Sequence, residues 1–513
     1  FYLLYFVLFI AIYSCKKENK PIVDPPIITP DSAAFTSVVL EAKNNAGKLT
    51  ADITCNITGN EITAVIPSMQ NDRKLVVTFA TINAGTVVKV NDTLQVSGTT
   101  LTDFNKPVTY AVTTPKGVTQ NYTFKIKNFT GIPIFYLTTS GPVVSKDDYV
   151  TGTLVINTNN EYEQEKLTIP LQIKGRGNAT WVLPKKPYRL KFDTKAAMLG
   201  LPAAKNWVLL ANYNDKSLLR TSAAFKLGQM VGADFTNHGR AVEVVMNGEY
   251  LGSYLLTEQV EVNDDRVDIP EIDADDVSGE KLTGGYLLEF DYRLDEEFWF
   301  KTAGGAPFTI KSPEDIEPQQ LAYITNYIQD FENSVISPDF ADPVNGYAKY
   351  INTDSFIKWC VVEELMRNTD ARNFSSIFYY KDRNGKLGMC SVWDFDNSGG
   401  NLKYDCADVS AGWWISKGPY FQRMFKDPAF KAKFAQEWNE LKAKLPELYT
   451  YIDDAAQYLN LSQQENFKRW NILNEDICAT TPLGTYNKEV EYLKAWLVKR
   501  ASWIDANLAT VGE

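Results

Sequence analysis

The sequence predicts a multidomain protein, in which an N-terminal all-β, immunoglobulin-like sandwich precedes an α+β domain with a helical C-terminal lobe. Three observations support this prediction. The chain has 513 residues, which is too long for one ordinary domain. Short strand-like runs separated by turn residues fill residues 33–128. Strands and helices mix after residue 131, and apolar residues at helical spacing dominate from about residue 408.

The first 32 residues have the composition of a leader and a tether. Residues 1–14 are almost wholly apolar but short for a membrane span, which is typical of a signal-peptide core, here truncated at its start. The run Ile12-Tyr13-Ser14-Cys15 resembles a bacterial lipobox, and a charged, proline-rich tether follows as far as residue 32, as in Bacteroidetes-type surface lipoproteins. We therefore expect a lipid on Cys15 that anchors the protein to the outer membrane or cell surface. An ordinary signal peptide with an incidental cysteine is the alternative.

Residues 33–128 are predicted to form the sandwich. Their runs LVVTFA, TVVKV, TLQV, VTYAVTT and NYTFKIKNF recur at the rhythm of a small antiparallel sheet protein. These residues contain no cluster of catalytic side chains. We interpret the sandwich as a spacer or binding module that holds residues 131–513 away from the membrane.

Composition excludes several classes of function. A net charge of −11 argues against a nucleic-acid partner, because phosphate affinity depends on clustered Lys and Arg. The single histidine, His238, sits in a turn before a strand, so histidine-based catalysis is not indicated. None of the six cysteines forms a Cys-x-x-Cys pair, which argues against zinc knuckles and thioredoxin-type redox chemistry. A disulfide between Cys390 and Cys406 remains open.

The α+β domain begins with strands at residues 171–175, 187–192 and 206–211 and a hairpin that turns at Asn247-Gly248. A helix is predicted between Asp215, as its N-cap, and Gly232, with Arg220 facing the pocket. Further strands are expected around residues 284–293 and 308–314. The remaining predicted helices cover residues 321–336, 354–368, 430–445, 448–459 and 486–508.

The clearest chemical signal lies in residues 368–397. Two strand-like runs, SSIFYY and LGMCSVW, are joined by KDRNGK, which predicts a hairpin. Asp370 and Asn373 lie at one open end of this hairpin, and Asp394 and Asp396 lie at the other. We expect these oxygens to converge on a hard cation such as Mg²⁺, with substrate phosphates as the remaining ligands. A solvated hairpin with polar ends is the alternative.

A basic strand lies upstream. Lys174 and Arg176 flank a glycine turn, and alternation places Arg189 and Lys191 on one face of the next strand. This arrangement predicts a phosphate clamp, whereas a solvated charged face is the alternative. Glu258 could pair with the clamp lysine or remain a surface carboxylate.

Several segments, in this order, resemble the CotH family of spore-coat-type atypical protein kinases. They are IKGRGNATW with KKPYRLKFD, WVLLANYNDKSLLR, VVMNGEYLGSYLLTE, and NTDARNF followed by VWDFD, within residues 135–401. The resemblance implies a divergent kinase-like fold over residues 131–513, use of ATP with Mg²⁺ or another divalent cation, and phosphorylation of secreted or surface proteins.

The resemblance also implies roles for single residues. Asp370 matches the catalytic-loop aspartate, which would orient and deprotonate an acceptor hydroxyl. The metal-facing positions are Asn373, Asp394 and Asp396. The positions that would hold ATP phosphates are Lys174, Arg176 and Lys191.

Two alternatives to a kinase remain open. A non-catalytic adhesin or scaffold could reuse the same fold and bind glycan or protein through an exposed segment around Trp413 and Trp414. A metal-assisted hydrolase could use the same carboxylates. The adhesin does not require Asp370 or Asp394, whereas the kinase does.

Overall fold

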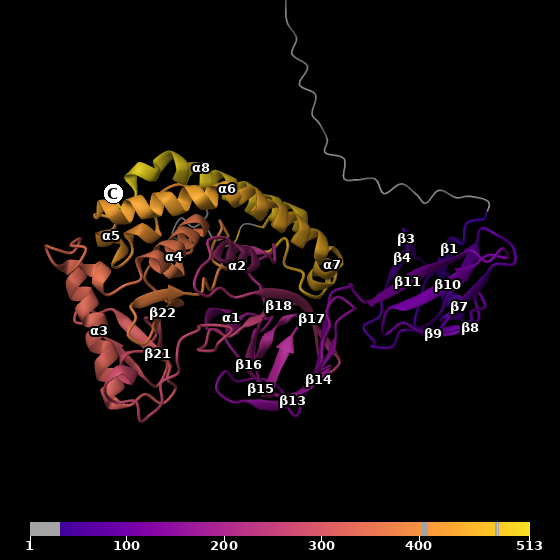
Figure 1. Cartoon of the computed structure of the whole chain (residues 1–513), viewed down its shortest axis with the longest axis horizontal. Helices are drawn as coiled ribbons and strands as arrows, with labels where there is room; N and C mark the ends of the chain where they lie inside the picture. The colour runs from indigo at the N-terminus through magenta and orange to yellow at the C-terminus, as the bar shows by residue number, and fades with distance from the viewer. Residues whose placement is uncertain (1–30, 402–408, 478–479, 481) are drawn as a thin grey trace, which may run out of the picture. The chain divides into compact units, whose positions relative to one another are not determined.

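The computed structural model describes residues 31–401, 409–477, 480 and 482–513. The predicted signal peptide, Cys15, nearly all of the tether and Cys406 lie outside these residues. The chain divides into two compact units, residues 1–129 and 130–513 (Figure 1). No helix in the described parts of the chain is long and apolar enough to cross a membrane.

The N-terminal unit consists almost entirely of β-strands. Its largest sheet has the order β3 (Asn56–Thr58), β4 (Glu61–Ile66), β11 (Thr119–Asn128), β10 (Val108–Thr113), β7 (Val87–Val90) and β8 (Thr93–Leu94). A second sheet joins β2 (Ile53–Thr54), β1 (Phe35–Leu40) and β6 (Thr78–Thr81), and a third pairs β5 (Lys74–Val76) with β9 (Leu101–Asp103). Buried side chains from these sheets form one hydrophobic core. The prediction of a purely antiparallel unit is wrong in one place, because β4 and β11 run parallel.

The C-terminal unit begins with a closed seven-stranded barrel. Its strands follow the order β12 (Ile134–Thr139), β13 (Val150–Asn157), β14 (Thr168–Gly175), β15 (Tyr188–Met198), β16 (Leu201–Leu210), β18 (Glu249–Glu258) and β17 (Gly239–Met246). A parallel pairing of β12 with β17 closes the barrel. On β15, Tyr188, Leu190 and Phe192 are buried in the barrel core. Alternation leaves Arg189 half-buried and Lys191 exposed on the other face, as predicted.

Two helices lie in the connections that follow strands β14 and β16 of the barrel. The short α1 (Ala179–Val182) lies between β14 and β15, and α2 (Arg220–Met230) follows β16. The predicted helix begins later than expected, because the chain from Asp215 to Leu219 forms a tight turn. The Asp215 carboxylate still accepts a hydrogen bond from the backbone N–H of Arg220, at 2.8 Å.

A second sheet carries the predicted hairpin. Its order is β20 (Trp299–Lys301), β21 (Pro307–Ser312), β19 (Tyr286–Phe290), β22 (Ile377–Lys381) and β23 (Leu387–Cys390). The hairpin between β22 and β23 is confirmed, with Lys381 opposite Leu387 and Asn384 in the left-handed region at φ 52°. The strand ends at Cys390, a buried free thiol, so Trp393 belongs to the following loop.

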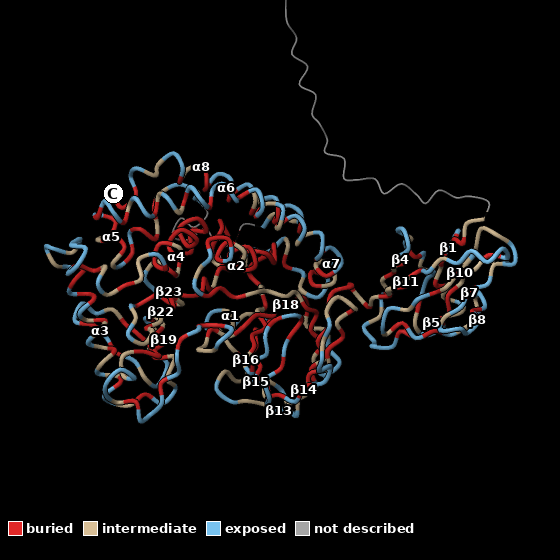
Figure 2. The backbone as a smooth tube through the Cα atoms, in the orientation of Figure 1, coloured by how far each residue is buried: buried red, intermediate tan, exposed pale blue. Residues whose placement is uncertain are grey.

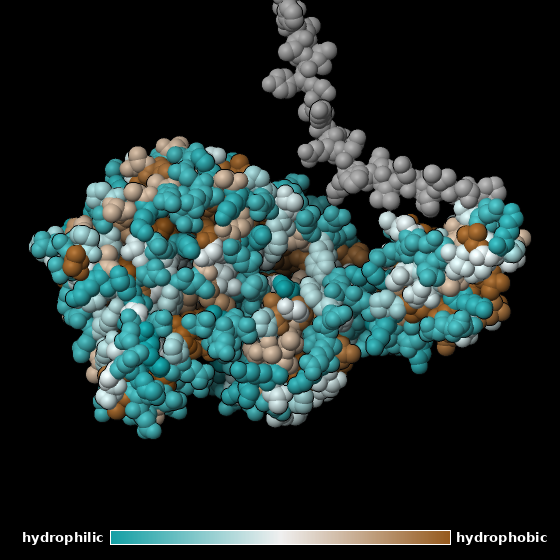
Figure 3. Space-filling view, in the orientation of Figure 1, coloured by the Kyte–Doolittle hydropathy of each residue, from teal (hydrophilic) through white to brown (hydrophobic). Residues whose placement is uncertain are grey.

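Helices complete the unit. They are α3 (Pro318–Ile336), α4 (Thr353–Met366), α5 (Phe421–Met424), α6 (Pro428–Tyr458), α7 (Asn460–Arg469) and α8 (Tyr486–Asn507). Figure 2 shows α4 buried along most of its length, and the face displayed in Figure 3 is mainly hydrophilic. The predicted pair of helices at residues 430–459 is a single helix. Pro446 removes one hydrogen-bond donor there, while a buried stripe that includes Trp438 and Leu448 runs past it without a break.

Candidate functional site

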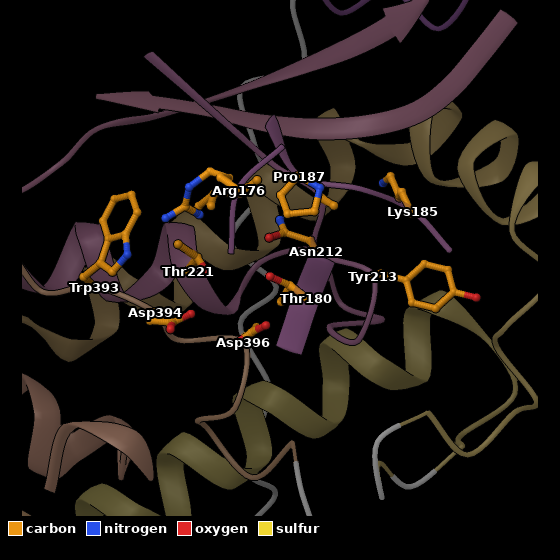
Figure 4. A pocket seen from close by; sticks show the side chains of 12 residues that line it. Arg176, Thr180, Lys185, Pro187, Asn212, Tyr213, Thr221, Trp393, Asp394 and Asp396 are labelled. Atoms are coloured by element: carbon orange, nitrogen blue, oxygen red, sulfur yellow. The ribbon is translucent and has the colours of Figure 1, made fainter. Parts of the chain in front are cut away.

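A cavity of about 260 Å³ joins the predicted carboxylates to a basic residue. Asp370 comes from a 3₁₀ turn (Asp370–Arg372) after α4, and Asp394 and Asp396 come from the loop after β23. Arg176 comes from the turn after β14. Figure 4 shows the adjoining, smaller pocket, in which Arg176, Asp394 and Asp396 recur. The predicted convergence of the three carboxylates on one site is therefore present in the structure.

The end of α4 places Asp370 beside the loop after β23. Arg367 adopts a left-handed conformation with φ 47°, which ends the helix and reverses the chain. The amide of Asn368 then donates to the carbonyls of Trp393 and Asp394, at 3.3 and 3.2 Å. These two bonds fix the loop that carries Asp394 against the turn that carries Asp370.

Asp394 has an unusual backbone conformation. Its φ is 65°, in the left-handed region that Asp and Asn enter more readily than other non-glycine residues. The hydroxyl of Ser376 donates to Asp394 Oδ2 at 3.3 Å. Ser376 precedes β22 and Asp394 follows β23, so the two open ends of the hairpin meet at this carboxylate.

Asp396 is buried among like charges. Burial raises its pKa far above the usual range, and the neighbouring carboxylates of Asp394, Asp370 and Asp215 raise it further. A hydrogen bond with Asn214 acts in the opposite direction. Carboxylates crowded in this way favour a cation among them.

Arg176 is the predicted basic residue that the structure places beside these carboxylates; Arg293, which sequence reasoning missed, also lines the cavity and pairs with Asp291. Its guanidinium carbon lies 5.4 Å from the centre of the Trp393 ring. Burial lowers the pKa of Arg176, whereas the charges of Asp394 and Asp396 raise it. Arginine remains protonated under such opposing influences. The next residue must be glycine, because Gly177 has φ 80° and a Cβ there would lie 2.2 Å from Thr180 Oγ1.

Arg220 does not line the cavity, which corrects the prediction that it faces the pocket. It is fully buried and pairs with Asp215. Its Nε and Nη2 donate to the carbonyls of Ser398 and Gly399, at 3.1 and 3.4 Å. Arg220 therefore holds the backbone of the loop after Asp396 through hydrogen bonds outside the cavity, and it is a positioning residue.

Lys174 and Lys191 lie together on the outer face of the barrel. Their ammonium groups stand 4.9 and 5.9 Å from the centre of the Tyr149 ring. Neither lysine lines the cavity of Asp370 or the adjoining pocket. Burial and the charge of Arg189 lower the pKa of Lys174, whereas Asp147 and Glu296 raise it, so the positive charges of this face are partly balanced by carboxylates.

The predicted pairing of Glu258 with a clamp lysine is wrong. Glu258 is buried and accepts hydrogen bonds from His238, from the backbone N–H at 2.8 Å and from the ring Nδ1 at 2.9 Å. A one-residue bulge near Gly252 shifts the β17–β18 register. That shift brings His238 opposite Glu258 at the end of the hairpin.

Asn373 is exposed and lies outside the residues that line the two pockets, so the structure does not bring it to the site. The 3₁₀ turn that begins at Asp370 ends at Asn373. Asn214 and Asn397 occupy the cavity wall instead, and Asn214 Nδ2 donates to Asn397 Oδ1 at 3.1 Å. Sequence reasoning missed both amides, although Asn397 directly follows Asp396.

Lys185 is a further missed residue. It lines the pocket of Figure 4 and is 1% exposed, and its Nζ donates to Asn466 Oδ1 at 2.8 Å and to the carbonyl of Ser253. Burial lowers the pKa of Lys185 to about 7, and the charge of Glu243 acts in the opposite direction. The signal in the sequence was the cluster of basic residues around β14 and β15, in which Lys174, Arg176, Arg189 and Lys191 were singled out and Lys185 was not.

The residues of the cavity fit a divalent cation that arrives with phosphates. Within the described residues, no three His, Cys, Asp or Glu side chains are grouped closely enough to hold an ion alone. Mg²⁺ usually takes one or two carboxylates and completes its shell with water and phosphate oxygens. Asn214 Oδ1 is buried without a hydrogen-bond partner and offers a further oxygen.

The predicted exposed tryptophan segment is not exposed. Trp413 is 6% exposed and its Nε1 donates to Thr510 Oγ1 at 3.1 Å. Trp414 is half-buried, and the guanidinium groups of Arg367 and Arg372 lie 5.0 and 4.6 Å from its ring centre. The adhesin hypothesis therefore loses the surface on which it depended.

Comparison with known proteins identifies the family. None of the curated proteins matches this chain. Among the solved structures that match, a candidate glycoside hydrolase from Bacteroides thetaiotaomicron has 19% identity and a TM-score of 0.17. The match covers 36% of this chain and 53% of that one, so the chain spans about half of that protein. The model of the family described as CotH kinase protein matches residues 172–504, which is more than half of the chain. This protein therefore belongs to the CotH family.

Proposed function

We propose that this protein is an ATP- and Mg²⁺-dependent kinase that phosphorylates hydroxyl groups of secreted or surface proteins. The observation that carries the proposal is the shared cavity of Asp370, Asp394 and Arg176. Phosphoryl transfer depends on positioning and on charge stabilisation, and this cavity combines carboxylates for a cation with an arginine for phosphates. Membership of the CotH kinase protein family supports the same activity.

Each residue has a distinct role in the proposed reaction. Asp370, which is half-buried, accepts the proton of the acceptor hydroxyl. At the same time the hydroxyl oxygen of the acceptor forms a bond to the γ-phosphorus of ATP, and the bond from that phosphorus to the oxygen that bridges to the β-phosphate breaks, which releases ADP. Asp394 and Asp396 hold Mg²⁺, which neutralises phosphate charge when bound. Arg176 would donate hydrogen bonds to the phosphate oxygens. Because Asp396 is buried, its carboxylate is dehydrated and its interaction with a cation is strengthened.

The proposal also covers location and partners. A lipid on Cys15 would hold the protein on the outer membrane or cell surface, and the acceptor would be a protein there rather than a nucleic acid. Lys174, Arg189 and Lys191 give the outer barrel face a positive charge next to Tyr149. This face would attract the negatively charged phosphates of ATP toward the cavity of Asp370, Asp394 and Asp396.

Calorimetric titration of ATP with Mg²⁺ into the full chain tests the proposal. We expect micromolar-range binding that Asp394→Asn weakens at least tenfold and that Asp370→Asn leaves within about twofold. In a phosphoryl-transfer assay both variants should lose more than about 100-fold in rate. Asp339→Asn, an exposed carboxylate outside the cavity, is the matched control. Absence of binding by folded protein would overturn the proposal.

A further inference from the structure

A second and larger cavity lies next to the proposed catalytic site. It has a volume of about 460 Å³, and strands β17 and β18, helix α6 and the start of α2 contribute to its wall. Aromatic and aliphatic side chains dominate that wall, among them Tyr162, Tyr254, Tyr451, Leu219 and Leu255. This volume falls within the range of sites for small organic ligands, about 300–1,000 Å³.

The cavity is distinct from the carboxylate site but adjoins it. Asn212 is the residue that lines both this cavity and the pocket of Figure 4, whereas Asp370, Asp394 and Asp396 line only the carboxylate side. The Tyr254 hydroxyl donates to the carbonyl of Lys186 at 3.0 Å, and its ring is buried in the barrel core beside the cavity.

One cation is held in the cavity wall. The guanidinium of Arg240 lies 5.8 Å from the centre of the Tyr162 ring. Its Nε donates to the carbonyl of Leu199 at 3.1 Å and its Nη1 to the carbonyl of Gly239 at 3.0 Å. These bonds hold the guanidinium in place and leave Nη2 available to a ligand. Asp454, which also lines the cavity, is exposed at its rim.

We propose that this cavity binds a small aromatic compound that carries an anionic group. Apolar walls favour a flat ring system, because burial removes its surface from water. The guanidinium of Arg240 is a rigid donor for a carboxylate, phosphate or sulfonate, and charge-assisted hydrogen bonds of this kind are the strong ones. The proposal does not depend on kinase activity, since none of the proposed catalytic residues lines the cavity.

Two fluorescent probes separate the two parts of this proposal. 8-Anilinonaphthalene-1-sulfonate has fused aromatic rings and a sulfonate, and N-phenyl-1-naphthylamine has the same rings without the charge. Both should bind the folded full chain. Arg240→Gln should weaken the sulfonate probe about tenfold and change the neutral probe less than about twofold. Asp454→Asn should strengthen the sulfonate probe about twofold, because it removes a like charge.

Cavity-filling variants test the location. Ala455→Trp and Ala241→Phe each replace a half-buried lining residue with a large ring, so either variant should remove binding of both probes. Gln457→Trp adds the same ring at an exposed neighbouring position and is the matched control. Circular dichroism selects the variants that fold, and one folded filling variant is sufficient for the test.

Three results would overturn the proposal. Unchanged binding of both probes in a folded filling variant would place them elsewhere. Equal losses for both probes in Arg240→Gln would show that the anion is not recognised. Displacement of the sulfonate probe by ATP with Mg²⁺ would make this cavity part of the nucleotide site rather than a second site, whereas failure of ATP to bind at all would count only against the kinase proposal.

Discussion

Arg220 Nη1 lies 2.6 Å from Asp215 Oδ1, and each side chain is only 1% exposed. The same guanidinium holds the carbonyls of Ser398 and Gly399, directly after the loop of Asp394 and Asp396. A buried ion pair thus connects the start of α2 to the proposed metal-binding loop. Removal of Arg220 leaves the charge of Asp215 uncompensated and takes one donor from each of the two carbonyls, of which that of Ser398 keeps a bond from the backbone N–H of Asn401.

We therefore predict that Arg220→Met lowers the free energy of unfolding by about 3–5 kcal/mol. Chemical denaturation of the full chain measures this change. Lys433→Met is the control, because Lys433 and Asp354 form an exposed pair whose loss should cost less than about 1 kcal/mol. Equal effects of the two substitutions would show that the buried pair does not stabilise the fold.

Arg176 provides a prediction about nucleotide affinity. Arg176→Met should raise the KM for ATP roughly 10- to 100-fold, because a charge-assisted contact with phosphate is lost. Arg176→Lys should recover part of this loss, since it restores the charge without the planar fork. Steady-state kinetics at varied ATP concentration separate KM from kcat. A KM unchanged in both variants would remove Arg176 from the phosphate site.

The burial of Lys185 should make the free energy of unfolding depend on pH. Its pKa falls from 10.5 in the unfolded chain to about 7 in the folded protein. Between about pH 7 and 10 the unfolded chain binds a proton that the folded protein does not, so this group raises stability as pH rises through that window and has a constant effect below it. Lys185→Met removes the effect.

The stability difference between wild type and Lys185→Met should therefore grow by roughly 2 kcal/mol in favour of wild type from pH 7 to pH 9. Denaturation curves at both pH values give this difference. The hydrogen bonds to Ser253 and Asn466 are lost at both pH values and cancel in the comparison. A difference independent of pH would place the pKa of Lys185 outside this window.

The N-terminal unit should be dispensable for the chemistry. It has its own hydrophobic core, and all the residues that line the carboxylate cavity lie in the C-terminal unit. We expect residues 130–513 alone to keep kcat/KM within about twofold on a soluble acceptor. A large loss with folded protein would show that the N-terminal unit takes part in substrate binding.

The central hairpin was predictable because its signals are local. Asn384 and Gly385 form the turn, and the alternation of the flanking runs predicts the two strands. Because a hairpin brings its two open ends together, Asp394 after β23 was expected to lie near the segment before β22. The glycine turn predicted Arg176 as part of a phosphate clamp, and the structure adds that Arg176 lies beside these carboxylates; its role toward phosphate stays a prediction.

The errors arose from backbone details that no short pattern encodes. The 3₁₀ turn that begins at Asp370 leaves Asn373 exposed. The bulge near Gly252 sets the register in which Glu258 lies opposite His238. Asn214 reaches the site from a segment some 180 residues before Asn397 in the chain. Such a contact depends on tertiary packing rather than on local sequence.

The left-handed backbone of Asp394 restricts which amino acids this position can accept. At φ 65°, Gly, Asn and Asp are accommodated with the least strain, and β-branched residues are strongly disfavoured. In a saturation library, selection for folding alone would accordingly enrich glycine and asparagine beside aspartate. Under selection for catalysis aspartate alone would survive, so the two enrichment profiles would separate structural from chemical constraint at a single codon.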